Sequence, residues 1–203
     1  GAAGVTVNDV VLAISAGALR RYLLQLSALP DVPLIAMVPV ALRGKGQHES
    51  GNAVGAVMCN LATHLSDPAA RLATISASMA EGKQAMATMT PLQIVAMTGL
   101  GMSPLVLQSI PGYAELFRPP FNIIISNVPG PRVPLYLNGA ELDGLYPLSV
   151  PYHGQALNIT CTSYHDELAF GLTGCRRTVP HLQHLLGYLD DELAALEQAV
   201  GLS

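Results

Sequence analysis

A helix is predicted near the start of the chain, because apolar residues recur there every three or four positions. Asn8 is expected to cap this helix, and Pro30 is expected to end it. The apolar positions of its buried face are Val10, Val11, Ile14, Ala18, Leu19, Tyr22, Leu23 and Leu26.

Two apolar runs at residues 34–42 and 53–61 predict strands that are separated by a polar loop containing Gly-Lys-Gly. Asp67 and Pro68 then predict a second helix, which has Asp67 as its cap and continues to about Met89. Thr90 and Pro91 repeat this start signal. A third helix is therefore expected to about Gly101, followed by a short helical run at residues 104–110.

The pattern changes to strands from residue 121 onward. Strands are predicted at residues 121–126, 142–150, 157–164 and 168–173, together with a hairpin centred on Asn138-Gly139. Residues 165–167 fit the turn between the last two strands, and a leucine stripe predicts a closing helix over residues 179–199. Helices and strands are interspersed without a regular βαβ repeat, so we expect one compact α/β sandwich with a mixed sheet.

The strand at residues 121–126 runs directly into a turn with the sequence Val-Pro-Gly-Pro. Ser126 and Asn127 stand at the end of this strand, where rigid scaffolds often present polar groups to ligands. They are our first candidates for a functional site. The alternative is an ordinary proline turn with no function.

Composition limits the classes of partner. Half of the residues are hydrophobic and only 12% are charged, against roughly 25% in typical soluble domains. Some apolar surface is therefore expected to face a partner. The net charge of −4 and the lack of a basic block argue against nucleic acid. The longest apolar tract, at residues 94–107, contains two glycines and a proline and is shorter than the roughly 20 residues that a membrane-spanning helix needs.

Several other residue types resemble functional sites. Cys59, Cys161 and Cys175 lie in apolar segments and are expected to be buried thiols. His181 and His184 lie three positions apart without further ligands, so no metal site is predicted. A methionine series has two interpretations, core filling or an adaptable lining for an acyl chain: Met79, Met86, Met89, Met97 and Met102.

Two motifs together carry a resemblance to a known family. They are S-N-V-P-G-P at residues 126–131 and V-N-D-V at residues 7–10, and residues 34–43, 51–52 and 139–151 extend the similarity. The chain resembles the C-terminal half of the bacterial wax ester synthase/diacylglycerol acyltransferase family, which includes the mycobacterial and other actinobacterial triacylglycerol synthases. The resemblance implies a fold of the chloramphenicol acetyltransferase type and transfer of a fatty acyl group from acyl-CoA to diacylglycerol or a long-chain alcohol.

The resemblance also implies that the catalytic histidine lies elsewhere. In this family it belongs to an H-H-x-x-x-D-G motif in the N-terminal half, and none of the six histidines of this chain fits that motif. Residues 1–203 are thus expected to be the C-terminal domain of the acyltransferase, inactive alone, with the N-terminal half as partner. No permanently bound cofactor is expected, and acyl-CoA is the co-substrate.

Six residues of this chain are candidates for supporting roles under this resemblance. Asn8 and Asp9 match a family motif, although helix capping alone would also explain them. Ser126 and Asn127 are candidate hydrogen-bond donors to the oxyanion, with Asn127 preferred because its amide is a fixed donor. Gly130 and Arg132 are the candidates for contact with the coenzyme, Arg132 through a phosphate.

Two other functions share the same fold. One is a catalytically silent lipid-binding or scaffolding module, and the other is a condensation-type acyltransferase that takes its donor from a carrier protein. A cytoplasmic location is expected, with peripheral contact at the inner membrane face or at lipid droplets left open.

Overall fold

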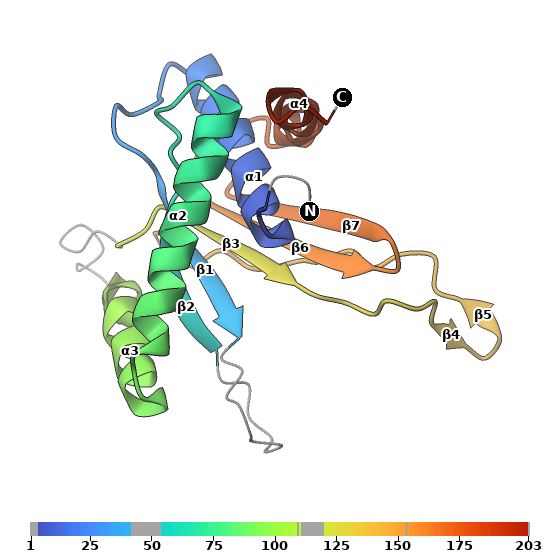
Figure 1. The fold of residues 1–203 in the computed structure, drawn as a ribbon, viewed down its shortest axis with the longest axis horizontal. Helices are drawn as coiled ribbons and strands as arrows, with labels where there is room; N and C mark the ends of the chain where they lie inside the picture. Colours follow the sequence, from blue (N-terminus) through green and yellow to red (C-terminus); the bar gives the residue numbers. More distant parts are fainter. Residues whose placement is uncertain (1–3, 42–53, 109, 111–119, 153, 203) are drawn as a thin grey trace.

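The computed structural model describes residues 4–41, 54–108, 110, 120–152 and 154–202. Its main sheet has five strands: β1 (Ile35–Ala41), β2 (Val54–Asn60), β3 (Ile123–Val128), β6 (Leu157–Tyr164) and β7 (Glu167–Gly174). Their order is β2-β1-β3-β6-β7 (Figure 1). The central strand β3 runs parallel to both neighbours, whereas the two outer pairs are antiparallel. The sheet is therefore mixed, as the sequence predicted.

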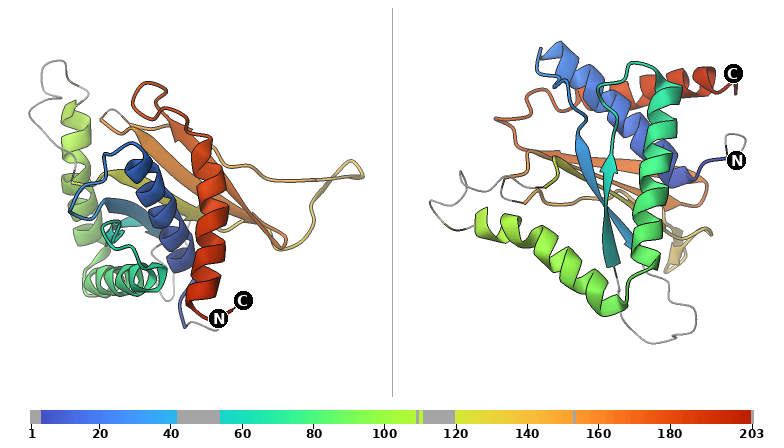
Figure 2. Two further views of the ribbon diagram at one scale, coloured as in Figure 1. Left: turned by 90° about the horizontal axis from the view of Figure 1, so that it is seen from above. Right: turned by 60° about the vertical axis from the view of Figure 1, so that its left-hand side comes forward.

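Three helices cover one face of this sheet: α1 (Val7–Gln25), α2 (Pro68–Ala87) and α4 (His184–Ala199) (Figure 2). The main core lies between them and the strands, and Leu12, Ile75 and Leu185 meet Ile125 and Ile159 there. The opposite face is called the open face below. The helix α3 (Pro91–Gln108) reaches this face beside β2, where Met102 packs against Met37 and Ile124.

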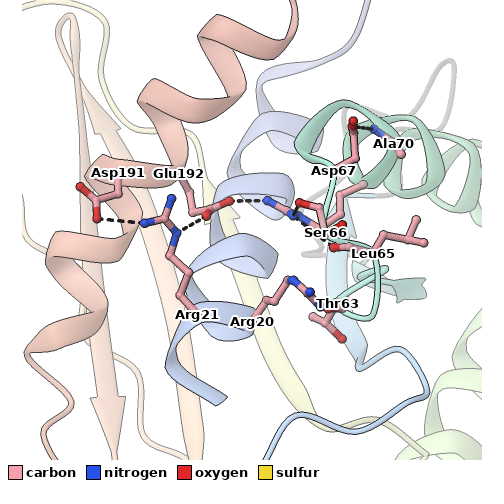
Figure 3. Close-up of polar contacts among 10 residues, drawn as sticks. Arg20, Arg21, Thr63, Leu65, Ser66, Asp67, Ala70, Asp191 and Glu192 are labelled. Carbon is pink, nitrogen blue, oxygen red and sulfur yellow. Dashed lines mark hydrogen bonds and ion pairs between the residues drawn. The ribbon is translucent and has the colours of Figure 1, made fainter. Parts of the chain in front are cut away.

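An ion network joins the three helices on the helix-covered side of the sheet (Figure 3). Glu192 of α4, which is 5% exposed, accepts hydrogen bonds from Arg21 of α1 and from the buried Arg71 of α2. Arg71 also donates to the carbonyls of Leu65 and Ser66, at 3.2 and 2.9 Å. Burial lowers the pKa of Arg71, and the charge of Glu192 opposes this shift. The network therefore fixes the relative positions of α1, α2 and α4.

Some predicted boundaries were wrong. Residues 91–108 form one helix, because the hydroxyl of Ser103 donates to the Leu100 carbonyl, which Pro104 cannot satisfy. The closing helix begins at His184 rather than at residue 179, since His181 has a φ of 56° that interrupts helical geometry. The start signals at Asp67 and Thr90 were confirmed by side-chain hydrogen bonds to Ala70 and Gln93.

The predicted hairpin was confirmed as β4 (Tyr136–Leu137) and β5 (Ala140–Glu141), and it projects beyond the end of the sheet in Figure 1. Asn138 and Gly139 both have positive φ, as a tight hairpin turn requires. The strand predicted at residues 142–150 was wrong: the described structure assigns no strand there. Pro147 removes a backbone donor from this segment.

Candidate active site

A hollow of about 450 Å³ lies on the open face, at the centre of the sheet. Strands β1, β3 and β6 form its floor, and residues 149–152 cross above it. Most of the lining is apolar, and Ser126, Ser149 and Asn158 provide its polar groups. The full lining is Met37, Pro39, Ile124, Ser126, Ser149, Val150, Pro151, Tyr152 and Asn158.

The pleat of β3 separates the two candidate donors. Ser126 lies on the open face with Ile124 and lines the hollow. Asn127 lies on the helix-covered face with Ile125, and its Oδ1 accepts a hydrogen bond from the Cys161 thiol at 3.3 Å. The geometry thus does not support the preference for Asn127 over Ser126 that its fixed amide suggested.

A hydrogen-bonded row of polar side chains runs beside Ser126. Ser149 and Thr160 share a hydrogen bond of 2.7 Å, and the Thr160 hydroxyl donates to Asn158 Oδ1 at 2.8 Å. Sequence reasoning missed Ser149 and Asn158 as site residues. Asn158 lies next to Ser126 because β3 and β6 are parallel neighbours. The alternation of polar residues along 157–164 was the one sequence signal that pointed to Asn158.

Gly130 holds the turn after β3 against the neighbouring strand. Its N–H donates to Ser163 Oγ at 3.0 Å, and a Cβ at this position would overlap the Ser163 carbonyl oxygen. Gly130 is not among the residues with positive φ, so close approach of the backbone, not turn geometry, requires glycine here. Arg132, two residues later, is exposed.

Replacing Gly130 with alanine is expected to lower the free energy of unfolding by about 2 kcal/mol, because the β3 turn must move away from β6. Urea denaturation of the two proteins measures this difference. Gly99→Ala is the matched control: nothing lies within 4 Å of a Cβ built there, in the helix α3. That change should stabilise the protein by about 0.5 kcal/mol. Equal stability of Gly130→Ala and the parent protein would refute this role for Gly130.

The start of α1 differs from the prediction. Thr6 is the cap, and Asn8 is the second residue of the helix. Thr6 Oγ1 accepts from the Asp9 N–H at 3.2 Å, while Asp9 Oδ2 accepts from the Thr6 N–H at 2.9 Å. The T-x-x-D spacing of a capping box was the signal that the prediction missed. Asp9 is 4% exposed, and its Oδ1 has no hydrogen-bond partner among the described residues.

Two of the three cysteines follow the prediction. Cys59 and Cys161 are buried, and burial raises the pKa of each thiol to about 11. Cys175 was wrongly predicted as buried: it is exposed, and hydrogen bonds from Thr178 lower its pKa to about 7. His181 and His184 stack with ring centroids 5.5 Å apart. Within the described ranges, no group of three or more possible metal-ligating side chains occurs.

Comparison with known proteins gives consistent matches over the chain. Residues 50–197 match the model of the WS/DGAT C-terminal domain. Two relatives named diacylglycerol O-acyltransferases, from Mycobacterium bovis and Mycobacterium tuberculosis, are each 58% identical over 202 residues. Each match covers 99% of this chain and 44% of the relative. The chain therefore spans less than half the length of these relatives.

Solved structures agree with the sequence matches. The wax ester synthase/diacylglycerol acyltransferase from Marinobacter aquaeolei VT8 is 45% identical, with a TM-score of 0.85 over 99% of this chain and 45% of that one. An epimerization domain of tyrocidine synthetase B matches with a TM-score of 0.59 at 15% identity over 98% of this chain and 44% of that one. The second match shows a shared fold alone.

Proposed function

The chain belongs to the family of WS/DGAT C-terminal domains, and from this membership we propose that it forms one half of an acyl-CoA-dependent acyltransferase. The acceptor is diacylglycerol or a long-chain alcohol, in keeping with the names of its relatives. The observation that carries the proposal is the hollow on the open face, where Ser126 and Asn158 stand in an otherwise mostly apolar lining.

The reaction is direct attack of the acceptor hydroxyl on the thioester carbonyl. A histidine of the N-terminal half takes the hydroxyl proton, the carbonyl oxygen becomes negative, and the proton passes to the departing coenzyme A thiolate. This chain provides the second wall of the site, and the Ser126 hydroxyl donates a hydrogen bond to the developing oxyanion. Met37 and Ile124 provide the buried apolar lining that helps to exclude water.

Three candidates outside the hollow keep supporting roles in the proposal. Asn8 and Asp9 position the loop of the histidine motif from the start of α1, where the buried Oδ1 of Asp9 has no hydrogen-bond partner among the described residues. Arg132 is exposed just beyond the Gly130 turn and pairs with a phosphate of the coenzyme.

Residues 146–152, called the strap, cross the open face above the hollow. Their inner side contacts the sheet. Ser149 shares a hydrogen bond with Thr160 of β6, and a Cβ on Gly171 of β7 would overlap the Pro147 carbonyl oxygen. Alternate side chains along the strap are exposed and form a row, called the outer row: Tyr146 (81%), Leu148 (80%), Val150 (79%) and Tyr152 (57%). The last two also border the hollow.

The outer row of the strap is the surface that receives the N-terminal half. Four large apolar side chains in one row are a typical sign of an interaction site. In the relatives, more than half of the polypeptide lies outside the matched region, which supports a partner of sufficient size. The acidic neighbours Glu141 and Asp143 disfavour an anionic lipid surface as the alternative partner.

Leu148→Asp should separate the two halves of the full-length protein after cleavage at a protease site engineered before Gly1. A charge buried against the partner should weaken their association about 100-fold, whereas Val32→Asp, on the α1–β1 connection and 66% exposed, should have no effect. Size-exclusion chromatography with light scattering measures the association. Halves that stay together in Leu148→Asp would contradict this assignment. If the halves stay together but Leu148→Asp no longer binds phosphatidylcholine vesicles, the strap contacts a lipid surface instead.

Acyl transfer by the full-length protein tests the proposed function. Purified protein is incubated with palmitoyl-CoA and either dioleoylglycerol or hexadecanol, and free thiol and ester product are measured together. Ester formation is the expected result. Binding of lipid without ester formation would identify a silent lipid-binding module. Transfer from a carrier-bound thioester but not from acyl-CoA would identify a condensation-type enzyme.

A further inference from the structure

The polar row beside Ser126 has a fixed direction of hydrogen bonding. The Thr160 hydroxyl has one proton, and it donates this proton to Asn158 Oδ1 at 2.8 Å. In the 2.7 Å hydrogen bond with Ser149, Thr160 can therefore only accept, so the Ser149 hydroxyl is the donor. The protons thus run from Ser149 on the strap, through Thr160, to the amide oxygen of Asn158.

This direction determines what each end of the row can offer to a ligand. Ser149 donates its only proton to Thr160, so it can only accept a hydrogen bond from a ligand. The oxygen of the Asn158 amide is engaged, but its nitrogen retains two N–H donors. Among the side-chain hydrogen bonds of the described residues, none uses this nitrogen. The row therefore presents donors at Asn158, in the same hollow as Ser126.

Asn158 and Ser126 lie on neighbouring parallel strands with their side chains on the same face. Ser126 pairs with Thr160 and Ile124 pairs with Asn158, so Asn158 is the diagonal neighbour of Ser126. Asn158 is only 5% exposed, and its hydrogen bond from Thr160 holds the amide in one orientation. A fixed amide donor was predicted at Asn127, which lies on the other face of β3. Asn158 provides such a donor within the hollow.

We propose that the amide nitrogen of Asn158 is a second hydrogen-bond donor to the carbonyl oxygen of the reacting thioester, beside the Ser126 hydroxyl. Thr160 and Ser149 are positioning residues, because they hold the amide oxygen and thereby direct the nitrogen to the ligand. This role rests on the proposed acyltransferase function. The described lining of the hollow has no charged side chain, so neutral donors are the groups here that stabilise the oxygen as it becomes negative.

Kinetics of variants of the full-length protein test this assignment. Asn158→Ala removes the donor and should lower kcat about 100-fold with little change in KM. Thr160→Val removes the hydroxyl that orients the amide and should lower kcat about tenfold. Thr162→Val is the matched control on β6: Thr162 is also 5% exposed and donates to the Val128 carbonyl at 2.9 Å, but it does not line the hollow. This control should lower the melting temperature as Thr160→Val does and leave kcat within about twofold.

Unchanged kcat in Asn158→Ala would overturn the donor assignment. Equal losses of kcat in Thr160→Val and Thr162→Val would show that Thr160 acts through stability alone, and this result would overturn its positioning role. Thr160→Ser restores the hydroxyl, so recovery of kcat in this variant supports the positioning role. A loss in Thr160→Ser equal to that in Thr160→Val would contradict it.

Infrared spectroscopy of a bound ketone gives a readout that does not depend on catalysis. The probe is a ketone analogue of palmitoyl-CoA with a methylene group between the sulfur and the carbonyl carbon, so it cannot transfer its acyl group. Hydrogen bonds lower the stretching frequency of a carbonyl, and Asn158→Ala should therefore raise this frequency relative to Thr162→Val.

The two readouts together separate this inference from the proposed function. If the infrared shift is found in a protein that forms no ester, the donor assignment holds and the acyltransferase proposal fails. If ester forms and the carbonyl frequency is the same in Asn158→Ala and Thr162→Val, the donor assignment fails. A protein that neither binds the ketone nor forms ester contradicts both.

Discussion

Replacing Glu192 with glutamine is expected to lower the free energy of unfolding by about 3 to 5 kcal/mol. The carboxylate accepts from Arg71 and Arg21, and the side chains of Arg71 and Glu192 are only 3% and 6% exposed. Removing its charge leaves the buried Arg71 guanidinium without its ion-pair partner. Desolvation, which already lowers the pKa of Arg71, then acts without the opposing charge of Glu192.

Urea denaturation followed by circular dichroism measures this change, and Asp191→Asn is the matched control. Asp191 also pairs with Arg21, at 3.2 Å, but its side chain is 59% exposed. Asp191→Asn should lower the free energy of unfolding by less than about 1 kcal/mol. The double variant Arg71→Met/Glu192→Leu should recover much of the stability, because an apolar pair removes the buried charge. A loss below 1 kcal/mol in Glu192→Gln would show that the network does not hold the helices together.

Under the proposed acyl transfer, replacing Ser126 with alanine in the full-length protein is expected to lower kcat by about 100-fold, with little change in KM for either substrate. This pattern marks a hydrogen bond that forms mainly in the transition state. Ser126 lies in the hollow, whereas Asn127 lies on the opposite face of β3 and binds Cys161. Asn127→Ala should therefore affect stability more than kcat.

Steady-state kinetics and thermal melts of both variants distinguish the two positions. Full activity of Ser126→Ala with a normal melting temperature would remove the oxyanion role from this residue. A 100-fold loss of kcat in Asn127→Ala at unchanged stability would instead identify the Asn127 amide as the donor to the oxyanion, as the sequence predicted. Asn158→Ala is a useful third variant, because Asn158 faces the same hollow from β6.

Local sequence signals predicted the elements of this fold well. Asp67-Pro68 and Asn138-Gly139 determine a helix start and a hairpin turn through contacts within a few residues, so both were found. Parallel strand neighbours such as β3 and β6 are set by tertiary packing. No local pattern shows which strands pair, and Asn158 was missed as a neighbour of Ser126 for this reason.

The strap and α3 show where sequence reasoning fails. Alternating apolar residues at 146–152 look like a strand, and only the structure shows that their outer side has no partner in the described part of the chain. Gly99, Gly101 and Pro104 look like helix breakers, yet α3 continues through them because the Ser103 hydroxyl satisfies the Leu100 carbonyl.

Reconstitution of acyl transfer from separate halves is the decisive measurement for an active site shared between the two halves. Residues 1–203, the N-terminal half and an equimolar mixture are each incubated with palmitoyl-CoA and dioleoylglycerol, and release of free coenzyme A is followed. Turnover is expected from the mixture and from neither half alone. Turnover by residues 1–203 alone, abolished by Ser126→Ala, would contradict the claim that this chain is one wall of a site whose base lies on the other half.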